Sequence, residues 1–337
     1  MLKMVIPLKI TIKDIAKMAE VSISTVSRVI NDSKPVNPDV RKRVLDAIKQ
    51  TNYRTSSLNN TLSRNESTLI GVITPEYSNT ILPDFIDGID KILKLYGYDI
   101  MIGLTDSTCE NEIHYLNLFR AEKTQGIIFV GSPFNHLHLE ILDTIPCVVA
   151  GQISQISTVP SVHVDNTMAS YEAVTCLIQK GHRNIAMIRA IDDNNAVGGD
   201  RVIGYKQALL DAGISIREEW IVESNFSVEG GMKAMRKISE IGTMPTAVFC
   251  ATDSMAIGAM NYLIDNGFRI PEDVSVFGFD GSLMSLIVRP KLSTVAYSAK
   301  EMGMTAARNL VKIIKGEEVN PHHYNITHHL EIRESTR

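Results

Sequence analysis

Several signatures of catalysis are missing from this 337-residue sequence. It contains no G-x-x-x-x-G-K-[ST] loop, no G-x-G-x-x-G turn after a predicted strand, no H-E-x-x-H helix and no G-x-S-x-G elbow. These motifs are typical of P-loop nucleotide hydrolases, dinucleotide-dependent enzymes, zinc proteases and serine hydrolases. Their absence argues against those classes, and we expect neither an enzyme nor a bound cofactor.

Cysteine is scarce, and histidine is not arranged as a metal site. The cysteines are scattered and mostly flanked by apolar residues: Cys109, Cys147, Cys176 and Cys250. This pattern fits neither a disulfide framework nor zinc-ligand spacing. The pairs His322-His323 and His328-His329 have no acidic or cysteine ligand spaced beside them. A solvated, histidine-rich turn is the favoured interpretation, and we expect no metal.

Long apolar runs are also lacking. No run reaches the length that crosses a bilayer. The first nine residues, M-L-K-M-V-I-P-L-K, are too short and too interrupted for a secretory signal. The sequence therefore predicts a soluble, cytoplasmic protein without a membrane partner.

The charge is unevenly distributed along the chain. The whole sequence carries a net charge of −4, but residues 1–65 are +7 and the remainder is −11. The length favours two or three domains. A small basic head on an acidic body is typical of a DNA-binding module attached to another domain.

The stretch from Thr11 to Asn31 predicts two short helices separated by a tight turn. Thr11 can cap the first helix and Ser22 the second, and apolar residues recur at helical spacing in both. The second helix presents small hydroxyls and an arginine outward: Ser22, Ser24, Thr25, Ser27 and Arg28. Such groups contact phosphates and base edges in the major groove, so this pattern favours a helix-turn-helix.

A third helix and a polar linker follow. Asn37-Pro38 starts a helix that runs to about residue 50, with Val40, Val44, Leu45 and Ile48 expected to be buried. Residues 53–67 are rich in hydroxyls and are either a solvated linker or a segment that becomes helical on DNA. In the second case Leu58 and Leu62 would share one face, where a leucine could wedge into the minor groove.

From Thr68 onward, short apolar runs alternate with amphipathic segments. Strands are predicted at 69–73, 98–104, 126–130 and 147–150, and the series restarts with strands at 185–188, 247–250 and 274–279. Near-continuous apolar strands separated by helices indicate parallel sheets covered on both faces. The predicted fold is therefore a small all-α helix-turn-helix head and an α/β body of two parallel-sheet lobes.

Polar residues follow several of these strands or begin the next helix, where the ligands of parallel sheets bind. They are Asn79, Arg201, Thr252 and Asp280, and the aromatic Phe226 lies in a loop of the same region. A carboxylate and an arginine can together bind adjacent sugar hydroxyls, and an aromatic ring can stack on the sugar. Purely structural roles are the alternatives to ligand binding: a cap or turn for Asp280, a surface ion pair for Arg201, and a core position for Phe226. Asp253 is expected to be a helix N-cap.

The first 65 residues resemble the head and hinge of the lactose-repressor (LacI/GalR) family of bacterial transcription regulators. The resemblance is carried by 11–16, Val21-Ser22, 25–31, Arg41, Val44 and Tyr53-Arg54. It implies that Ile23, Ser24 and Arg28 read bases and that Leu62 is the minor-groove wedge. The DNA-contacting set is then Thr11, Ser22, Ile23, Ser24, Thr25, Ser27, Arg28, Asn31, Tyr53, Leu58 and Leu62. Thr55 replaces a usual proline, and Asn59-Asn60 are poor helix formers, so we expect a hinge helix that forms less readily than is typical.

The resemblance extends over the whole chain and implies a body like the periplasmic sugar-binding proteins. Its expected parts are a head at 1–54, a hinge at 55–67 and a core at 68–337. One lobe is expected at about 68–160 and 293–321, and the other at about 161–292 and 322–337. The family implies a homodimer on a palindromic operator, controlled by a small sugar or sugar-phosphate effector.

The body is most similar to the catabolite-control branch of the family, through V-P-S-V at 159–162, G-H-R-N-I-A at 181–186 and V-R-P-K-L at 288–292. That branch implies a partner, the serine-phosphorylated phosphocarrier protein HPr, whose phosphate would meet Arg308 and Lys312 on an exposed helix face. Lys300 stands where that surface usually has a tyrosine. Two alternatives of other classes are a solute-binding protein without a DNA role and a sugar-modifying enzyme.

Overall fold

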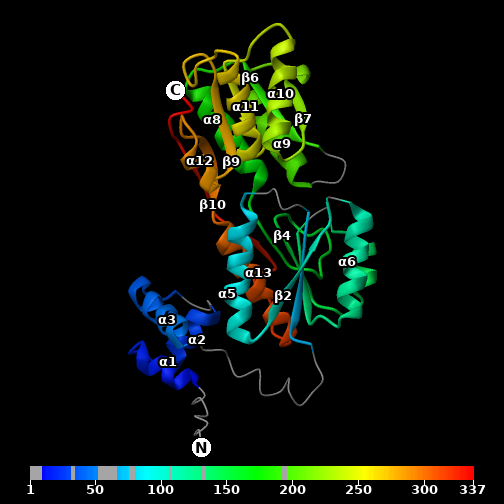
Figure 1. The fold of residues 1–337 in the computed structure, drawn as a ribbon, viewed down its shortest axis with the longest axis vertical. Helices are drawn as coiled ribbons and strands as arrows, with labels where there is room; N and C mark the ends of the chain where they lie inside the picture. The colour runs from blue at the N-terminus through cyan, green and yellow to red at the C-terminus, as the bar shows by residue number, and fades with distance from the viewer. Residues whose placement is uncertain are drawn as a thin grey trace, which may run out of the picture.

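The computed structural model describes residues 10–31, 35–51, 67–75, 80–106, 108–130, 134–191 and 196–337. Figure 1 shows a small helical head and two α/β lobes stacked along the long axis. Among the described residues, no helix has the length and apolar character needed to span a bilayer. Asn79, Tyr53, Leu58, Leu62 and the hinge pair Asn59-Asn60 lie outside the described residues, as does the side chain of Asn31.

The head is formed by α1 (Ile12–Met18), α2 (Ile23–Asn31) and α3 (Pro38–Thr51). Both predicted caps of the helix-turn-helix are present. Thr11 and Asp14 form a capping box, in which the Thr11 hydroxyl and backbone N–H each lie 2.7 Å from the Asp14 carboxylate. The Ser22 hydroxyl accepts a hydrogen bond from the Thr25 N–H at 3.1 Å. Glu20 takes a positive φ of 52° in the turn between the two helices.

The core of the head is small and apolar. It contains buried side chains from all three helices: Ile15, Val26, Val29, Val44 and Ile48. The expectation that Leu45 is buried was wrong, because 40% of it is exposed. The buried stripe of α3 runs through Val44, Ala47 and Ile48, and the turn of about 100° per residue places Leu45 beyond the edge of that stripe.

The first lobe is one parallel sheet with helices on both faces. Its strands are β1 (Leu69–Thr74), β2 (Asp99–Leu104), β3 (Gly126–Phe129), β4 (Cys147–Ala150), β5 (Ser161–His163) and β11 (His323–Asn325), in the order β11-β5-β4-β3-β1-β2. Every pairing in it is parallel. The helices α5 (Leu82–Tyr96) and α13 (Ala299–Ile314) pack together on one side, and α6 (Cys109–Ala121) and α7 (His136–Leu142) on the other (Figure 1).

The second lobe repeats this plan. Its strands are β6 (Ile185–Ala190), β7 (Ile221–Ser224), β8 (Ala247–Cys250), β9 (Ser275–Asp280), β10 (Ser293–Tyr297) and β12 (His328–Glu331), in the order β12-β10-β9-β8-β6-β7. Only the pairing of β12 with β10 is antiparallel. The helices are α8 (Asn166–Gln179), α9 (Ala196–Asp211), α10 (Val228–Glu240), α11 (Asp253–Asp265) and the short α12 (Leu283–Ile287), with a 3-10 turn at Glu218–Trp220.

The strand order corrects the expected lobe boundaries. β5 and β11 belong to the first sheet, although 161–292 and 322–337 are the segments expected in the second lobe. β10 belongs to the second sheet, although 293–321 is expected in the first lobe. The chain crosses between lobes after a strand has been completed, at 164–165, 298 and 326–327. The apolar pattern marks a strand but does not show which sheet it joins, so the three boundaries were misplaced.

These three crossings fix how the sheets face one another. β5 and β11 leave the first sheet at their carboxyl ends, and β10 leaves the second sheet at its carboxyl end. The carboxyl edges of both sheets are therefore turned toward the junction of the lobes (Figure 1). Ligands of open parallel sheets bind at this edge.

Candidate functional site

A polar cluster occupies the carboxyl edge of the second sheet. Arg201 from α9 is only 5% exposed, and its Nε donates to Oδ1 of Asn166 at the start of α8, 3.0 Å away. A second guanidinium nitrogen donates to the carbonyl oxygen of Ala251. The guanidinium carbon also lies 3.5 Å from the centre of the Phe279 ring. Together these contacts hold Arg201 in one orientation.

Asp280 completes the cluster at the last position of β9. Its Oδ1 lies 3.7 Å from Nη2 of Arg201 and accepts a hydrogen bond from the Tyr297 hydroxyl at 3.2 Å. Among the described residues, the other carboxylate oxygen of Asp280 accepts no hydrogen bond. The structure therefore presents a carboxylate acceptor beside a fixed guanidinium donor, which is a pairing suited to adjacent hydroxyl groups.

The backbone of Asp280 is strained. Its φ is 116°, in a region that residues with a side chain rarely adopt. Such conformations persist only where the surroundings enforce them, and they are concentrated at functional sites. This φ therefore supports a functional role for Asp280 rather than the purely structural role of a turn residue.

Asp253 supplies part of that enforcement from α11. Its carboxylate accepts hydrogen bonds from the Ser282 N–H at 2.7 Å and from the Thr294 hydroxyl at 2.6 Å. These contacts tie the segment after Asp280 to the neighbouring strand β10. The expectation that Asp253 is an N-cap was wrong, since the cap is Thr252, whose hydroxyl accepts from the Met255 N–H at 3.2 Å.

Burial controls the ionisation of this cluster. It raises the pKa of Asp280 to about 7, although the positive charge of Arg201 acts in the opposite direction. Burial likewise raises the pKa of Asp253 to about 6, against the hydrogen bond from Thr294. The pKa of Tyr297 is raised by burial and by the charge of Asp280. Perturbed carboxyl groups of this kind are a physical mark of a binding site.

The sequence-predicted effector residues are only partly brought together. The structure joins Arg201 and Asp280, which rules out the alternative of a surface ion pair for Arg201. Thr252 follows Ala251, whose carbonyl oxygen accepts from Arg201. The side chain of Thr252 is buried, and its hydroxyl caps α11. Phe226 is half-buried against the apolar core of the second lobe. Asn166 and Tyr297 were missed, because neither forms a motif with Arg201 or Asp280 in the sequence.

The predicted DNA-reading side of α2 is polar at its start. Ser22, Ile23, Ser24 and Arg28 are exposed, and Thr25 and Ser27 are half-buried. The Ser22 hydroxyl lies 2.8 Å from the hydroxyls of both Ser24 and Thr25. The inner face is formed by buried valines and isoleucine, so this helix offers one polar surface to a partner.

Two protein families match parts of this chain. Residues 11–56 match the family described as "Bacterial regulatory proteins, lacI family", and residues 174–336 match "Periplasmic binding protein-like domain". Catabolite control protein A of Priestia megaterium is 35% identical over 98% of this chain and 100% of its own length. The chain belongs to the LacI family of transcription regulators.

Other members of the LacI family agree with this assignment. The transcriptional repressor CytR of Escherichia coli is 32% identical over 97% of this chain and 96% of its own length. The solved structure of the regulator CelR with cellobiose covers 97% of this chain and 99% of its own, with a TM-score of 0.74 and 28% identity. The regulator CcpA of Lactococcus lactis covers 81% and 100%, also with a TM-score of 0.74 and 28% identity. The predicted family and fold class are thus confirmed, and these relatives are regulators of transcription.

The predicted phosphoprotein surface on α13 differs from its expected form. Arg308 is only 8% exposed rather than lying on an open helix face. Burial lowers the pKa of Arg308 to about 10, and the positive charge of Arg41 in α3 lowers it further. Arg308, Lys312 and Lys315 nevertheless line one small depression together with Tyr96. The Lys315 ammonium lies 4.1 Å from the centre of the Tyr96 ring.

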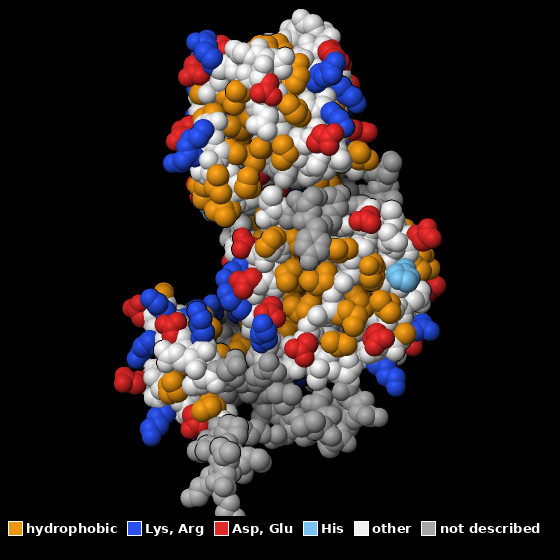
Figure 2. All heavy atoms as spheres, in the orientation of Figure 1, with side chains coloured by type: hydrophobic (Ala, Val, Ile, Leu, Met, Phe, Trp, Pro, Cys, Tyr) orange, Lys and Arg blue, Asp and Glu red, His pale blue; other side chains and the backbone are white. Residues whose placement is uncertain are grey.

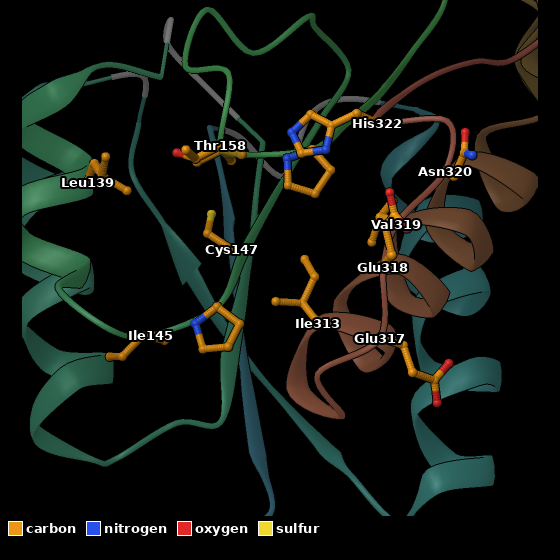
Figure 3. A pocket seen from close by; sticks show the side chains of 13 residues that line it. Leu139, Ile145, Cys147, Thr158, Ile313, Glu317, Glu318, Val319, Asn320 and His322 are labelled. Atoms are coloured by element: carbon orange, nitrogen blue, oxygen red, sulfur yellow. The ribbon is translucent and has the colours of Figure 1, made fainter.

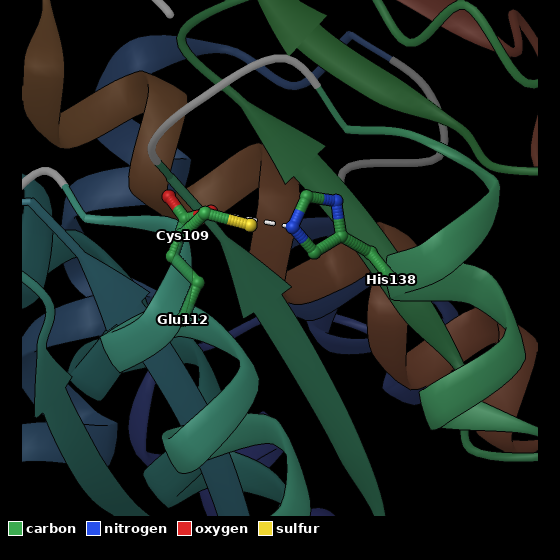
Figure 4. Close-up of side chains that lie close together, drawn as sticks. All are labelled: Cys109, Glu112 and His138. Atoms are coloured by element: carbon green, nitrogen blue, oxygen red, sulfur yellow. Dashed lines mark hydrogen bonds and ion pairs between the residues drawn. The ribbon is translucent and has the colours of Figure 1, made fainter.

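A further cluster, Cys109, Glu112 and His138, went unnoticed in the sequence (Figure 4). Nε2 of His138 lies 3.2 Å from the Glu112 carboxylate, and both side chains are fully buried. Nδ1 of His138 accepts a hydrogen bond from the Asn135 N–H at 3.1 Å, so the ring proton is on Nε2 and points at Glu112. A histidine that binds metal usually donates from its other nitrogen. The observed hydrogen bonds instead favour a buried pair that ties α6 to α7.

The late histidines lie at the edges of the two sheets. Nε2 of His328 lies 3.1 Å from the Glu172 carboxylate, and Nε2 of His329 lies 2.9 Å from Glu331. The rings of His322 and His323 meet edge to face, with centroids 5.3 Å apart. His328 thus has a distant carboxylate partner, whereas the partner of His329 is only two residues away, so the expectation that no acidic residue is spaced beside these pairs was wrong.

Proposed function

We propose that this LacI-family regulator is a repressor of carbohydrate-use genes that binds a palindromic operator as a homodimer. A small sugar or sugar phosphate at the junction of the lobes controls it. The observation that carries the proposal is the buried Arg201–Asp280 pair, with Asp280 held at a strained φ on the sheet edge that faces the first lobe. CelR, a relative of the same fold, was solved in complex with cellobiose, which supports a sugar as the ligand class.

The chemistry of the pair suits a diol. One hydroxyl of the sugar donates to the carboxylate of Asp280, and its neighbour accepts from the guanidinium of Arg201, which Asn166 and Phe279 hold in place. Three chain crossings join the lobes. A ligand that contacts both lobes therefore changes the angle between them. That movement alters the spacing of the two heads in a dimer and so the affinity for the operator.

A thermal-shift screen of sugars, sugar phosphates and serine-phosphorylated HPr tests the effector. A sugar that stabilises the wild type should fail to stabilise Asp280→Ala, while both proteins bind operator DNA. Glu229→Gln, which removes an exposed carboxylate on α10, is the matched control and should respond as the wild type does. A sugar that stabilises Asp280→Ala as strongly as the wild type would place the effector elsewhere.

A gel-shift assay tests the DNA-binding head. Arg28→Ala should abolish specific operator binding and leave effector binding intact, because Arg28 is exposed on the outer face of α2 and does not contribute to the core. Lys49→Ala, on the exposed side of α3, is the control for the loss of one positive charge. Unchanged operator binding by Arg28→Ala would contradict the assignment of α2 as the reading helix.

An exposed apolar helix supports the dimer. Leu283 of α12 is 68% exposed, and Met284, Leu286 and Ile287 are exposed beside it. Figure 2 shows hydrophobic side chains gathered where α12 lies at the side of the second lobe. A second copy covering this surface would remove it from water. Light scattering after gel filtration should give a dimer for the wild type and a smaller species for Leu283→Glu.

The second candidate function is control by serine-phosphorylated HPr. It is favoured by the convergence of Arg308, Lys312 and Lys315 on one depression, because clustered cations bind phosphate. Docking requires Arg308 to become more exposed than it is beside α3. Lys312→Glu should then weaken binding of the phosphorylated protein and leave sugar binding unchanged.

A further inference from the structure

A separate concave site lies at the amino-terminal edge of the first sheet, opposite the edge that faces the junction of the lobes (Figure 3). This open hollow has a volume of about 530 Å³ and lies between the amino-terminal ends of β4 and β5, the end of α13 and the segment that follows α13. This volume is within the range of small-molecule sites. The Arg201–Asp280 pair is at the carboxyl edge of the second sheet, so the two sites are distinct.

The wall of this site is largely apolar. Ile145, Val159 and Ile313 contribute aliphatic surface, and Cys147 contributes a buried thiol. Burial raises the pKa of the Cys147 thiol, so the group stays protonated and behaves as a small apolar side chain. Figure 3 shows Ile313 and Cys147 on opposite sides of the hollow.

The charged side chains of the wall are carboxylates. Glu317 and Glu318 both line the site, and the lining residues include no lysine or arginine. Figure 3 shows the Glu317 side chain turned away from the middle of the site, which leaves Glu318 as the carboxylate nearer a ligand. Nε2 of His322 is buried and has no hydrogen-bond partner among the described residues. A buried polar atom without a partner is costly, so a ligand that bonds to it gains affinity.

We propose that this site binds a small primary amine with an apolar body. The ammonium group pairs with Glu318, and the apolar body packs between Cys147 and Ile313. Bonding of a ligand N–H to Nε2 of His322 requires the imidazole to turn toward the site, because this nitrogen is buried. An anion is disfavoured because the wall offers carboxylates and no cationic side chain. The proposal does not depend on the sugar site or on HPr.

The site lies at the edge where the chain enters the body. β1 begins at Leu69, directly after the segment that joins the head, and its amino-terminal end is on the same edge as those of β4 and β5. An amine bound here is therefore on the head-proximal side of the first lobe, and the sugar site is on the far side.

Binding of 2-phenylethylamine to the full-length protein, measured by ligand-observed NMR and calorimetry, tests the proposal. Two matched probes keep the apolar body and change the charge: 2-phenylethanol is neutral and 3-phenylpropionate is an anion. The amine should bind more tightly than the alcohol, and the anion least. Glu318→Gln should weaken the amine about threefold, as for an exposed ion pair, and leave the alcohol unchanged. His322→Phe keeps the ring volume and should weaken the amine as well.

Two controls separate this site from the rest of the molecule. Glu229→Gln removes an exposed carboxylate in the second lobe and should leave all three affinities unchanged. Asp280→Asn should bind the amine as the wild type does. The proposal is overturned by absence of amine binding, by equal binding of the amine and the anion, by amine binding that survives both site variants unchanged, or by its loss in Asp280→Asn.

Discussion

Replacing Asp280 by asparagine should change the pH dependence of stability in the second lobe. Because burial raises the pKa of Asp280 to about 7, the native chain binds more protons than the unfolded chain between about pH 4 and about pH 7. The unfolding free energy therefore falls as pH rises through this window. A shift of about three units corresponds to on the order of 4 kcal/mol. Asparagine keeps an acceptor for the Tyr297 hydroxyl but does not titrate.

Trp220 provides the assay. It is the only tryptophan in the chain, it is buried, and it packs in the core of the second lobe, which also contains β9. Urea unfolding followed by its fluorescence, at about pH 4.5 and about pH 7.5, reports on the lobe that holds Asp280. Relative to Asp280→Asn, the wild type should lose on the order of 3 kcal/mol between these two pH values. Parallel pH profiles for the two proteins would refute the reasoning.

The same ionisation affects ligand binding. The ionised carboxylate of Asp280 is a stronger acceptor for hydroxyl groups than the neutral acid. Sugar affinity of the wild type should therefore rise as pH increases through about 7, and calorimetry over that range measures it. Asp280→Asn should bind weakly, with an affinity that does not change with pH.

Three further predictions concern stability. Gly258→Ala places a Cβ 2.0 Å from the carbonyl oxygen of Val228, so it should destabilise the second lobe by about 1–3 kcal/mol in the Trp220 assay. Gly198→Ala, whose Cβ comes no closer than 3.3 Å to the Ala190 side chain, should lose less. Thr11→Ala removes the capping box of α1 and should lower the unfolding free energy of the head by about 1 kcal/mol. Circular dichroism at the helical wavelength, recorded at low urea concentrations, measures this loss. Glu112→Gln keeps an acceptor for His138, so in thermal unfolding it should be milder than Glu112→Ala, which leaves the buried imidazole without its partner; equal losses would contradict the assigned hydrogen bond.

The head and the strands of the body could be predicted because their signals are local. Thr11 and Ser22 cap helices through contacts with residues three positions away. The apolar runs that became β1, β3, β4 and β8 are buried from end to end or nearly so. Such patterns depend on a few neighbouring residues, so the sequence carries them directly.

The lobe boundaries depend on pairing between distant strands. β5 is three residues long and pairs with β11, 162 positions further along at Ser161 and His323. Nothing near Ser161 in the sequence indicates that partner. β10 is similarly defined by its pairing with β9 on one side and β12 on the other. The fold class could be predicted, while the assignment of these short strands to sheets required the structure.

The candidate effector site shows the same limit more sharply, because five segments build it. Arg201 and Asp280 could be proposed singly, since an arginine at a helix start and an aspartate at a strand end are recognisable positions. Their orientation depends on Asn166, 35 positions before Arg201, and on Tyr297, 17 positions after Asp280. The segment that follows Asp280 is held by the hydrogen bonds of Asp253 to Ser282 and Thr294, which no local pattern reveals. The residues that contact a ligand are thus easier to predict than those that hold them in place, and substitutions at Asn166 or Tyr297 test the second group.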